Sequence, residues 1–234
     1  LFNRLTSVDA TGLDGTLNLD LLGNTRIASF VGGDGDTRLV LSGGGAPRVA
    51  YDVELGAGDD LFITSAAGLS GADLFEGGDG NDGFEVHFGA GGPASVLGGP
   101  VVAAINNATG FEDLIIDRWA SNGDINLDAG VVNTFSNFIF QHTVPGNPGM
   151  TAFSGSSSRL GTLEDVVVTN TADSDSFLVN ADQVASLNFS AAGGATALDL
   201  TLAGLDAATG TVAAGANGPA QVNDNVDALN LFGY

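Results

Sequence analysis

Cysteine and lysine are both absent from this sequence of 234 residues, and proline occurs only six times. Without cysteine, the chain has no disulfide bonds as cross-links. Without lysine, its six basic residues are all arginines, which stand against 28 acidic residues and give a formal net charge of −22. This charge argues against nucleic acid and anionic membrane surfaces as partners, and it favours divalent cations.

Long apolar runs and catalytic sequence patterns are absent as well. No run approaches the roughly 20 apolar residues of a membrane-spanning helix, and G-x-S-x-G, H-E-x-x-H and phosphate-loop patterns do not occur. His87 and His142 have no metal-binding or catalytic spacing, and we interpret each as a strand or loop residue. Carboxylate pairs such as Glu112/Asp113 imitate glycosidase acids, but similar pairs recur along the chain and favour a structural role. We therefore expect a protein that is not an enzyme and has no transmembrane segment.

Glycine is abundant, with 36 residues, while 44% of the residues are hydrophobic and 15% are charged. This composition is too apolar for a disordered acidic tail, and it lacks the Gly-X-Y period of collagen. It is typical of a β protein with many glycine turns.

A nonapeptide recurs three times in the first part of the chain. Residues 77–85 (GGDGNDGFE) fit the pattern G-G-x-G-x-D-x-U-x, where U is apolar, at every fixed position. Residues 55–63 (LGAGDDLFI) fit at all but the first position, and residues 32–40 (GGDGDTRLV) have Thr37 where the Asp belongs. The copies start 23 and 22 residues apart, which predicts one motif per coil, stacked along one side of a solenoid.

The residue types in these turns point to calcium. Glycine accepts positive φ and lets carbonyl groups point inward, and carboxylates complete the shell of a hard cation that takes six to eight oxygen ligands. Asp60 and Asp82 are the principal expected ligands; the alternative is that each caps its own turn. Asp73 belongs to a half-motif and is an extra candidate. The full set assigned to calcium is Gly33, Asp34, Gly35, Asp36, Gly56, Gly58, Asp59, Asp60, Asp73, Gly77, Gly78, Asp79, Gly80, Asn81 and Asp82.

Beyond residue 110 the glycine motif ends, but a unit of an apolar residue, two polar or small residues and a strand continues. It starts at residues 111, 135, 163, 184 and 226, with spacings of 24, 28, 21 and 42, the last interpreted as two coils. Short strands at this period, with no helix-length pattern, predict an all-β fold, a parallel β-solenoid with coils of about 21–24 residues and calcium-binding glycine/aspartate turns. A β-sandwich also has many short strands, but it gives no reason for one motif to return at the same offset.

The solenoid is expected to run continuously over residues 1–234. Residues 1–92 form its calcium-binding part, and residues 101–234 form a parallel β-helix part without the glycine motif. The chain starts with Leu1-Phe2-Asn3-Arg4, which is neither a start methionine nor a signal peptide. We interpret the chain as a fragment of a longer protein.

The nonapeptides at 55–63 and 77–85 resemble those of RTX calcium-binding β-roll proteins. More loosely, the chain is similar to calcium-dependent surface-layer proteins of Gram-negative bacteria. The resemblance implies type I secretion, folding triggered by calcium and assembly into a lattice at the cell surface. It also implies that four turn acids contribute to calcium binding chiefly through their backbone carbonyls: Asp34, Asp36, Asp59 and Asp79. The alternative is that these four are acids of the turns that are solvated and bind no ion.

The leading hypothesis is an extracellular structural protein, a calcium-stabilised component of a bacterial surface layer, sheath or filament. The alternative is an RTX calcium-binding and secretion module of a larger type I-secreted hydrolase or adhesin. A β-helix enzyme acting on polysaccharide has only the architecture in its favour. The expected partner is a further copy of the chain, in a lattice or filament. The chain is expected to be secreted to the exterior or surface of a Gram-negative bacterium, and contact with cell-surface polysaccharide is assigned to parts of the protein outside this chain.

Overall fold

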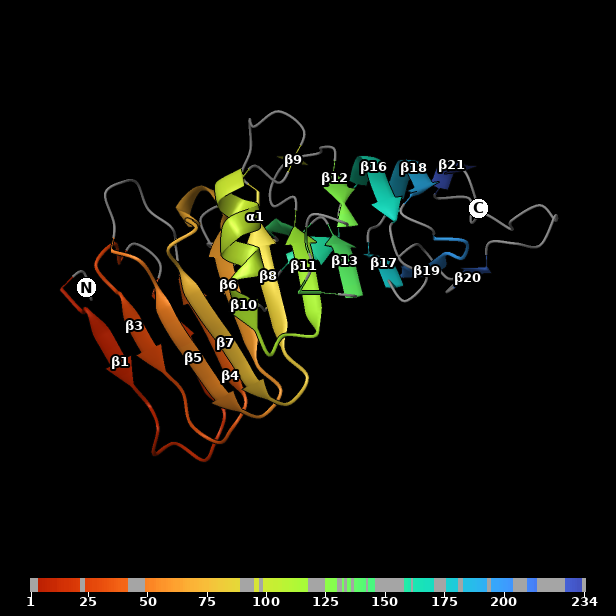
Figure 1. Ribbon diagram of the computed structural model, residues 1–234. Coiled ribbons are helices and arrows are strands. Elements are labelled where there is room, and N and C mark those ends of the chain that lie inside the picture. Colours follow the sequence, from red (N-terminus) through yellow and green to blue (C-terminus); the bar gives the residue numbers. More distant parts are fainter. Residues whose placement is uncertain are drawn as a thin grey trace. The chain divides into compact units, whose positions relative to one another are not determined.

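The structure is a computed structural model, shown in Figure 1. It divides into two compact units, Leu1–His87 with Gly98–Leu114, and Phe88–Leu97 with Ile115–Tyr234. The residues that the structure describes are 4–21, 24–41, 49–88, 95–96, 99–117, 125–129, 132, 134–135, 137–141, 143–145, 158–160, 162–170, 176–180, 183–192, 195–203, 210–213 and 226–232.

The first unit is built from two parallel sheets. Its odd-numbered strands with β10 form one sheet and its even-numbered strands form the other, so each coil contributes one strand to each sheet; Figure 1 shows β1, β3, β5 and β7 side by side. The first sheet has the order β1 (Ser7–Asp9), β3 (Ser29–Val31), β5 (Asp52–Ala57), β7 (Leu74–Asp79) and β10 (Ala108–Thr109). The second contains β2 (Leu17–Asp20), β4 (Thr37–Leu41), β6 (Leu61–Ser65) and β8 (Gly83–His87).

The register of these strands follows the coil period. Phe30 is paired with Val53 and Val53 with Phe75, in parallel, so partners are 23 and 22 residues apart. Alternate side chains of β5 and β7 are buried, because successive residues of a strand point to opposite faces. Inside the unit, the ring of Phe62 lies 4.9 Å from that of Phe75 and 5.1 Å from that of Phe84, measured between centroids. The apolar positions at this spacing therefore make the core.

The second unit also contains a parallel sheet, with the order β9, β12, β16, β18 and β21, and in a second sheet β13, β17 and β19 are parallel neighbours. β20 pairs with β19 in the antiparallel sense, and β14 pairs with β15 in the same sense. The bounds are β9 (Ser95–Val96), β11 (Asp113–Asp117), which contains the division between the units, β12 (Ile125–Asp128), β13 (Asn137–Gln141), β14 (Thr143–Pro145), β15 (Ser158–Leu160), β16 (Thr162–Asn170), β17 (Ser176–Asn180), β18 (Gln183–Ala191), β19 (Asp199–Ala203), β20 (Gly210–Ala213) and β21 (Val226–Phe232).

The expected fold class is confirmed as an all-β parallel solenoid, and the equivalence of the repeat units at 163, 184 and 226 is confirmed by register. Val166 pairs with Leu187, and Leu187 pairs with Leu229. The interpretation of the last 42-residue interval as two coils was wrong. β18 pairs directly with β21, and β20, which lies between them in the sequence, pairs with β19 in the antiparallel sense and not with another coil.

Two other expectations of the repeat pattern were wrong. The unit at residue 135 forms β13, which lies in the sheet of β17 and not in the sheet of β16 and β18. An α-helix is also present, α1 (Gly99–Asn106). A short 3₁₀ turn, η1 (Ala66–Gly68), lies between β6 and β7 in the sequence. Pro100 is tolerated in α1 because the first turn of a helix leaves its N–H groups without intrahelical partners. Among the described residues, no helix is long and apolar enough to cross a membrane.

Candidate metal centre

The three nonapeptides lie in one stack of turns, each linking a strand of the first sheet to a strand of the second. Asp34 N donates to Leu13 O (3.1 Å), Ala57 N to Gly33 O (2.9 Å) and Gly58 N to Asp79 O (3.0 Å), so backbone hydrogen bonds join neighbouring turns. A further turn continues the stack beyond the last nonapeptide, where Glu112 N donates to Asp82 O (3.0 Å). We call this stack the turn row; it consists of residues 10–15, 33–37, 56–60, 78–82 and 110–112.

In the second and third nonapeptides, glycine is required by backbone conformation and by the close approach of the neighbouring turn. Gly78 and Gly80 have φ values of 117° and 143°, which side chains of L-residues rarely allow. A Cβ added to Gly78 would lie 1.7 Å from Gly56 O, and one added to Gly80 would lie 2.0 Å from Gly58 O. The glycine pattern therefore sets the turns at backbone contact, with carbonyl oxygens of one coil against the next.

The acids at the Asp position of the motif hold the turn of the preceding coil. Asp60 Oδ1 accepts a hydrogen bond from Thr37 N (2.6 Å), and Asp82 Oδ1 accepts one from Asp60 N (2.8 Å). Glu112 Oε2 does the same for Asp82 N (2.7 Å). Asp60 and Asp82 therefore do cap a backbone group, as the alternative reading of these residues expected, but the group belongs to the neighbouring turn.

The second oxygen of each Asp is left over. Asp60 and Asp82 are 3% and 0% exposed, and their Oδ2 atoms are buried without a hydrogen-bond partner among the described residues. A buried carboxylate oxygen without a partner is strongly destabilising unless a cation or a proton compensates it. In the turn row, these two atoms are the ones that need a compensating cation or proton.

The pKa values of Asp60 and Asp82 are raised, as expected for buried carboxylates without a compensating charge. Burial raises the pKa of Asp60 to about 6; the hydrogen bond from Thr37 N opposes the shift, and the charges of Asp82, Asp36 and Asp59 add to it. The pKa of Asp82 is also raised, first by burial, against the opposing hydrogen bond from Asp60 N, with the charges of Glu112, Asp59 and Asp79 adding. The row thus concentrates carboxylates that repel one another.

A second series of hydrogen bonds between neighbouring turns involves solvent-exposed carboxylates, beside the series made by the buried ones. Asp36 Oδ1 accepts a hydrogen bond from Asp59 N (3.0 Å), and Asp59 Oδ1 accepts one from Asn81 N (3.0 Å). The carboxylates of Asp36 and Asp59 also act electrostatically on Asp60. The structure therefore brings Asp36, Asp59, Asp60, Asn81 and Asp82 together, and the carbonyl of Asp79 takes part in the backbone bonds of the row.

Asp73 lies elsewhere in the coil. It follows η1, in the turn that leads back from the second sheet to the first. Its Oδ1 accepts a hydrogen bond from Tyr51 N (3.0 Å) and its Oδ2 one from Ser70 N (2.8 Å), and the side chain is fully buried. The structure does not bring Asp73 to the other candidate ligands, and its oxygens already serve the backbone.

Glu112 is the residue that the sequence patterns missed. The signal that would have found it is shorter than the nonapeptide: a glycine two residues before the acid, as in Gly58–Asp60 and Gly80–Asp82, recurs as Gly110–Glu112. Gly110 has a positive φ of 68°, and Gly58 and Gly80 also have positive φ values.

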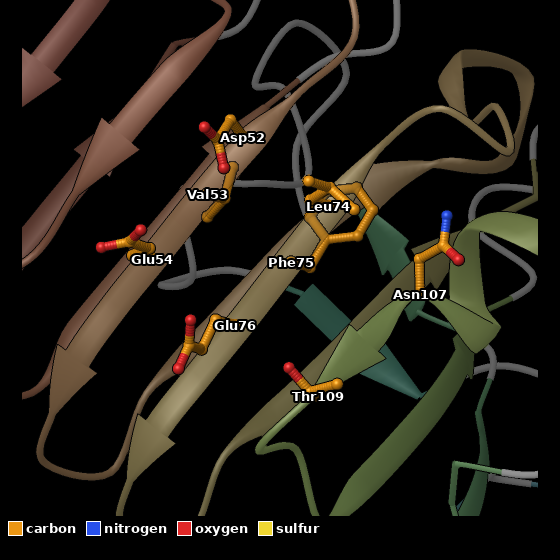
Figure 2. Close-up of a pocket in the computed structure, with 8 residues that line it drawn as sticks. All are labelled: Asp52, Val53, Glu54, Leu74, Phe75, Glu76, Asn107 and Thr109. Atoms are coloured by element: carbon orange, nitrogen blue, oxygen red, sulfur yellow. The ribbon is translucent and has the colours of Figure 1, made fainter.

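A groove lies on the outer face of the first sheet. Figure 2 shows this groove, in which Glu54 of β5 and Glu76 of β7 project from neighbouring strands. These two residues are register partners, and Leu74 beside them is 55% exposed. The groove has a volume of ≈ 340 Å³ and is lined by Asp52, Val53, Glu54, Leu74, Phe75, Glu76, Asn107 and Thr109.

The histidines do not contribute to the turn row in the described part of the chain. His87 ends β8, as a strand residue, and its Nε2 contacts Oε1 of Glu85; both side chains are buried. His142 lies outside the described residues.

Comparison of the whole chain with protein-family models, with curated proteins and with solved structures finds no match in any of the three. The chemistry of the turn row is therefore the ground on which a function is assigned.

Proposed function

We propose that this protein is an extracellular structural β-solenoid whose first unit is stabilised by calcium bound in the turn row. The observation that supports the proposal is the pair of buried Oδ2 atoms of Asp60 and Asp82, which have no partner among the described residues while their Oδ1 atoms hold the neighbouring turns. Each free oxygen marks one cation site. A cation there neutralises carboxylates that otherwise repel one another.

Calcium fits the donors that the row supplies. Carboxylate and backbone carbonyl oxygens are the ligands of hard cations, and calcium accepts six to eight of them in variable geometry, whereas magnesium demands a strict octahedron and keeps its waters. The acids at the two sites are Asp60 and Asp82, with Asp36 and Asp59 nearby. When bound, calcium supplies positive charge between stacked turns, and the residues of the chain supply the rigid frame.

The structural role follows from the same stacking. The turn row holds strands whose core residues, such as Phe62 and Phe84, are fully buried, so a cation between turns stiffens the stack of coils. Bound calcium also reduces the net charge of −22, which otherwise keeps copies of the chain apart. We therefore propose self-association into a lattice, sheath or filament at the outside of a bacterial cell, where calcium is plentiful.

A calcium titration of the full chain tests both parts of the proposal. Thermal unfolding and hydrogen exchange are measured in metal-free buffer and in calcium, and sedimentation velocity follows association. Binding to the native state stabilises by about 2.7 kcal/mol at a free concentration one hundred times Kd, so the first unit should gain protection and the chain should associate as calcium rises.

The double variant Asp60→Asn/Asp82→Asn should abolish the response to calcium, because Asn keeps an acceptor for the Thr37 and Asp60 N–H groups but loses the charge. The matched control Glu54→Gln/Glu76→Gln removes the same number of charges from the outer sheet face and should keep the response. A wild-type chain with the same melting temperature with and without calcium would overturn the calcium proposal. A strict monomer at millimolar calcium would overturn the lattice.

A further inference from the structure

The end of the turn row lies outside the nonapeptides. The turn of residues 110–112 packs directly on the third nonapeptide, since Glu112 N and Asp113 N both donate to Asp82 O, at 3.0 and 3.1 Å. In return, Asp82 N donates to Glu112 Oε2 (2.7 Å). The peptide groups of Asp82 are thus enclosed by residues 110–113 on the side away from Asp60.

Gly77 leaves room for oxygens at this end. A Cβ added to Gly77 would lie 2.0 Å from Gly110 O and 2.7 Å from Asp82 Oδ2. The missing side chain thus makes a small cradle that a carboxylate oxygen and a carbonyl oxygen both face. Asp82 Oδ2 is the buried atom that lacks a partner among the described residues. The charge of Glu112 acts on the same carboxylate.

We infer that Glu112 is a further calcium ligand, which shares with Asp82 and the carbonyl of Gly110 the cation at the end of the turn row. This inference rests on the proposed function and extends it to a residue outside the nonapeptide pattern. It makes the last cation a link between the nonapeptide coils and the segment of residues 108–113.

The opposite end of the row differs. In the first nonapeptide, Thr37 occupies the position at which the pattern has an acid. Its Oγ1 lies 3.4 Å from Gly35 O in its own turn. No carboxylate at position 37 reaches back to the turn of residues 10–15, in the way that Asp60, Asp82 and Glu112 each reach the turn before them. The row therefore holds two cations, one at Asp60 and one at Asp82 with Glu112.

The experiment is a calcium titration by calorimetry on the full chain and on the variant Glu112→Gln. Gln keeps an oxygen acceptor for Asp82 N–H and removes only the charge. We expect two sites in the wild type and, in the variant, loss of one site or a weakening of its affinity by at least tenfold. The matched control Asp113→Asn removes a charge from the adjacent residue, which contacts Asp82 O through its backbone N–H and keeps that contact, and should bind two ions.

Two further measurements separate ligation from a structural role. In metal-free buffer, Glu112→Gln should melt at or above the wild-type temperature, because a repulsive charge beside Asp82 is removed. On the background of Asp82→Asn, Glu112→Gln should cause no additional loss of binding. If Glu112→Gln does not fold, Glu112→Asp, which keeps the charge on a shorter side chain, should fold and bind the second ion more weakly than the wild type does.

The outcomes are distinct. Wild-type binding of two ions that persists unchanged in Glu112→Gln, or in Glu112→Asp where Gln does not fold, overturns the role of Glu112 and leaves the proposed function in place. Equal losses in Glu112→Gln and Asp113→Asn also overturn it, because the effect would then be one of long-range charge. A wild type that binds no calcium overturns both.

Discussion

The turn row and the outer face of the first sheet both carry stacked acids at the spacing of the coil, yet they are different environments. Glu54 and Glu76 are register partners on the outer face and are exposed to solvent. Asp60 and Asp82 are one coil apart as well, but they are 3% and 0% exposed. Water solvates the first pair, whereas burial leaves the second pair with uncompensated oxygens. A repeat of acids thus indicates a cation site only where the fold buries a carboxylate oxygen without a partner, as it does in Asp60 and Asp82.

The largest expected effect tests how tightly the turn row is built. Gly77→Ala places a Cβ 2.0 Å from Gly110 O and 2.7 Å from Asp82 Oδ2, distances at which the backbone has to move. Overpacking of this kind typically destabilises by about 1–3 kcal/mol, and we expect a value near 3 kcal/mol here, measured by denaturant unfolding in calcium.

Gly12→Ala is the control, because nothing lies within 4 Å of a Cβ at Gly12. A surface change of this type should stay within about 0.5 kcal/mol of the wild type. Equal destabilisation by the two substitutions would show that the end of the turn row at Gly110 is no more constrained than its open first turn at Gly12, and the comparison would fail.

An intermediate effect concerns pH in metal-free buffer. Burial raises the pKa of Asp60 to about 6, above the value of about 4 of an unfolded Asp. The folded state thus favours protonated Asp60. The contribution of Asp60 to the free energy of unfolding is therefore complete below pH about 4 and is lost as pH rises through about 6. The metal-free first unit should melt at a lower temperature at pH 7 than at pH 5.

General repulsion among the 28 acidic residues acts in the same direction, so the control is Asp60→Asn, which should show a smaller change between the two pH values. Calcium at pH 7 should restore the melting temperature of the wild type, because the cation replaces the proton as the group that compensates the buried carboxylate. Metal-free wild type that becomes more stable from pH 5 to pH 7 would contradict the assignment of Asp60 as a buried acid.

Much of the fold could be predicted because the coil length is nearly constant where the pattern is strong. The nonapeptides start 23 and 22 residues apart, and the same offsets separate the register partners Phe30, Val53 and Phe75. The prediction failed where residues are added to a coil, as at the hairpin of β19 and β20, since a count of residues does not say whether they form another coil or a loop.

The candidate site shows the same limit. Asp60 and Asp82 are found from the motif, 22 residues apart, but Glu112 follows Asp82 by 30 residues because the coil between them includes α1. The insertion leaves the stack of turns intact and changes only the count. Asp73 fails in the other direction: it resembles the motif acids in sequence, but it lies in the return turn, where Tyr51 N and Ser70 N use its oxygens.

The smallest expected effect belongs to the outer face. Glu76→Arg replaces a like-charge pair with Glu54 by an opposite pair on neighbouring strands, which contributes about 0.2–1 kcal/mol. The aliphatic part of Arg can also cover the exposed Leu74, on the same face of β7. We expect stabilisation of about 0.5 kcal/mol in low salt and less at about 1 M salt, where the screening length is about 3 Å.

Glu76→Gln, which only removes the repulsion, should give part of this gain. Because these side chains are solvated, the shift in melting temperature on adding calcium should be the same in both variants as in the wild type. A loss of that shift in Glu76→Arg, of the size expected for Asp82→Asn, would mean that the outer face takes part in binding, and that burial is not what separates the two rows of acids.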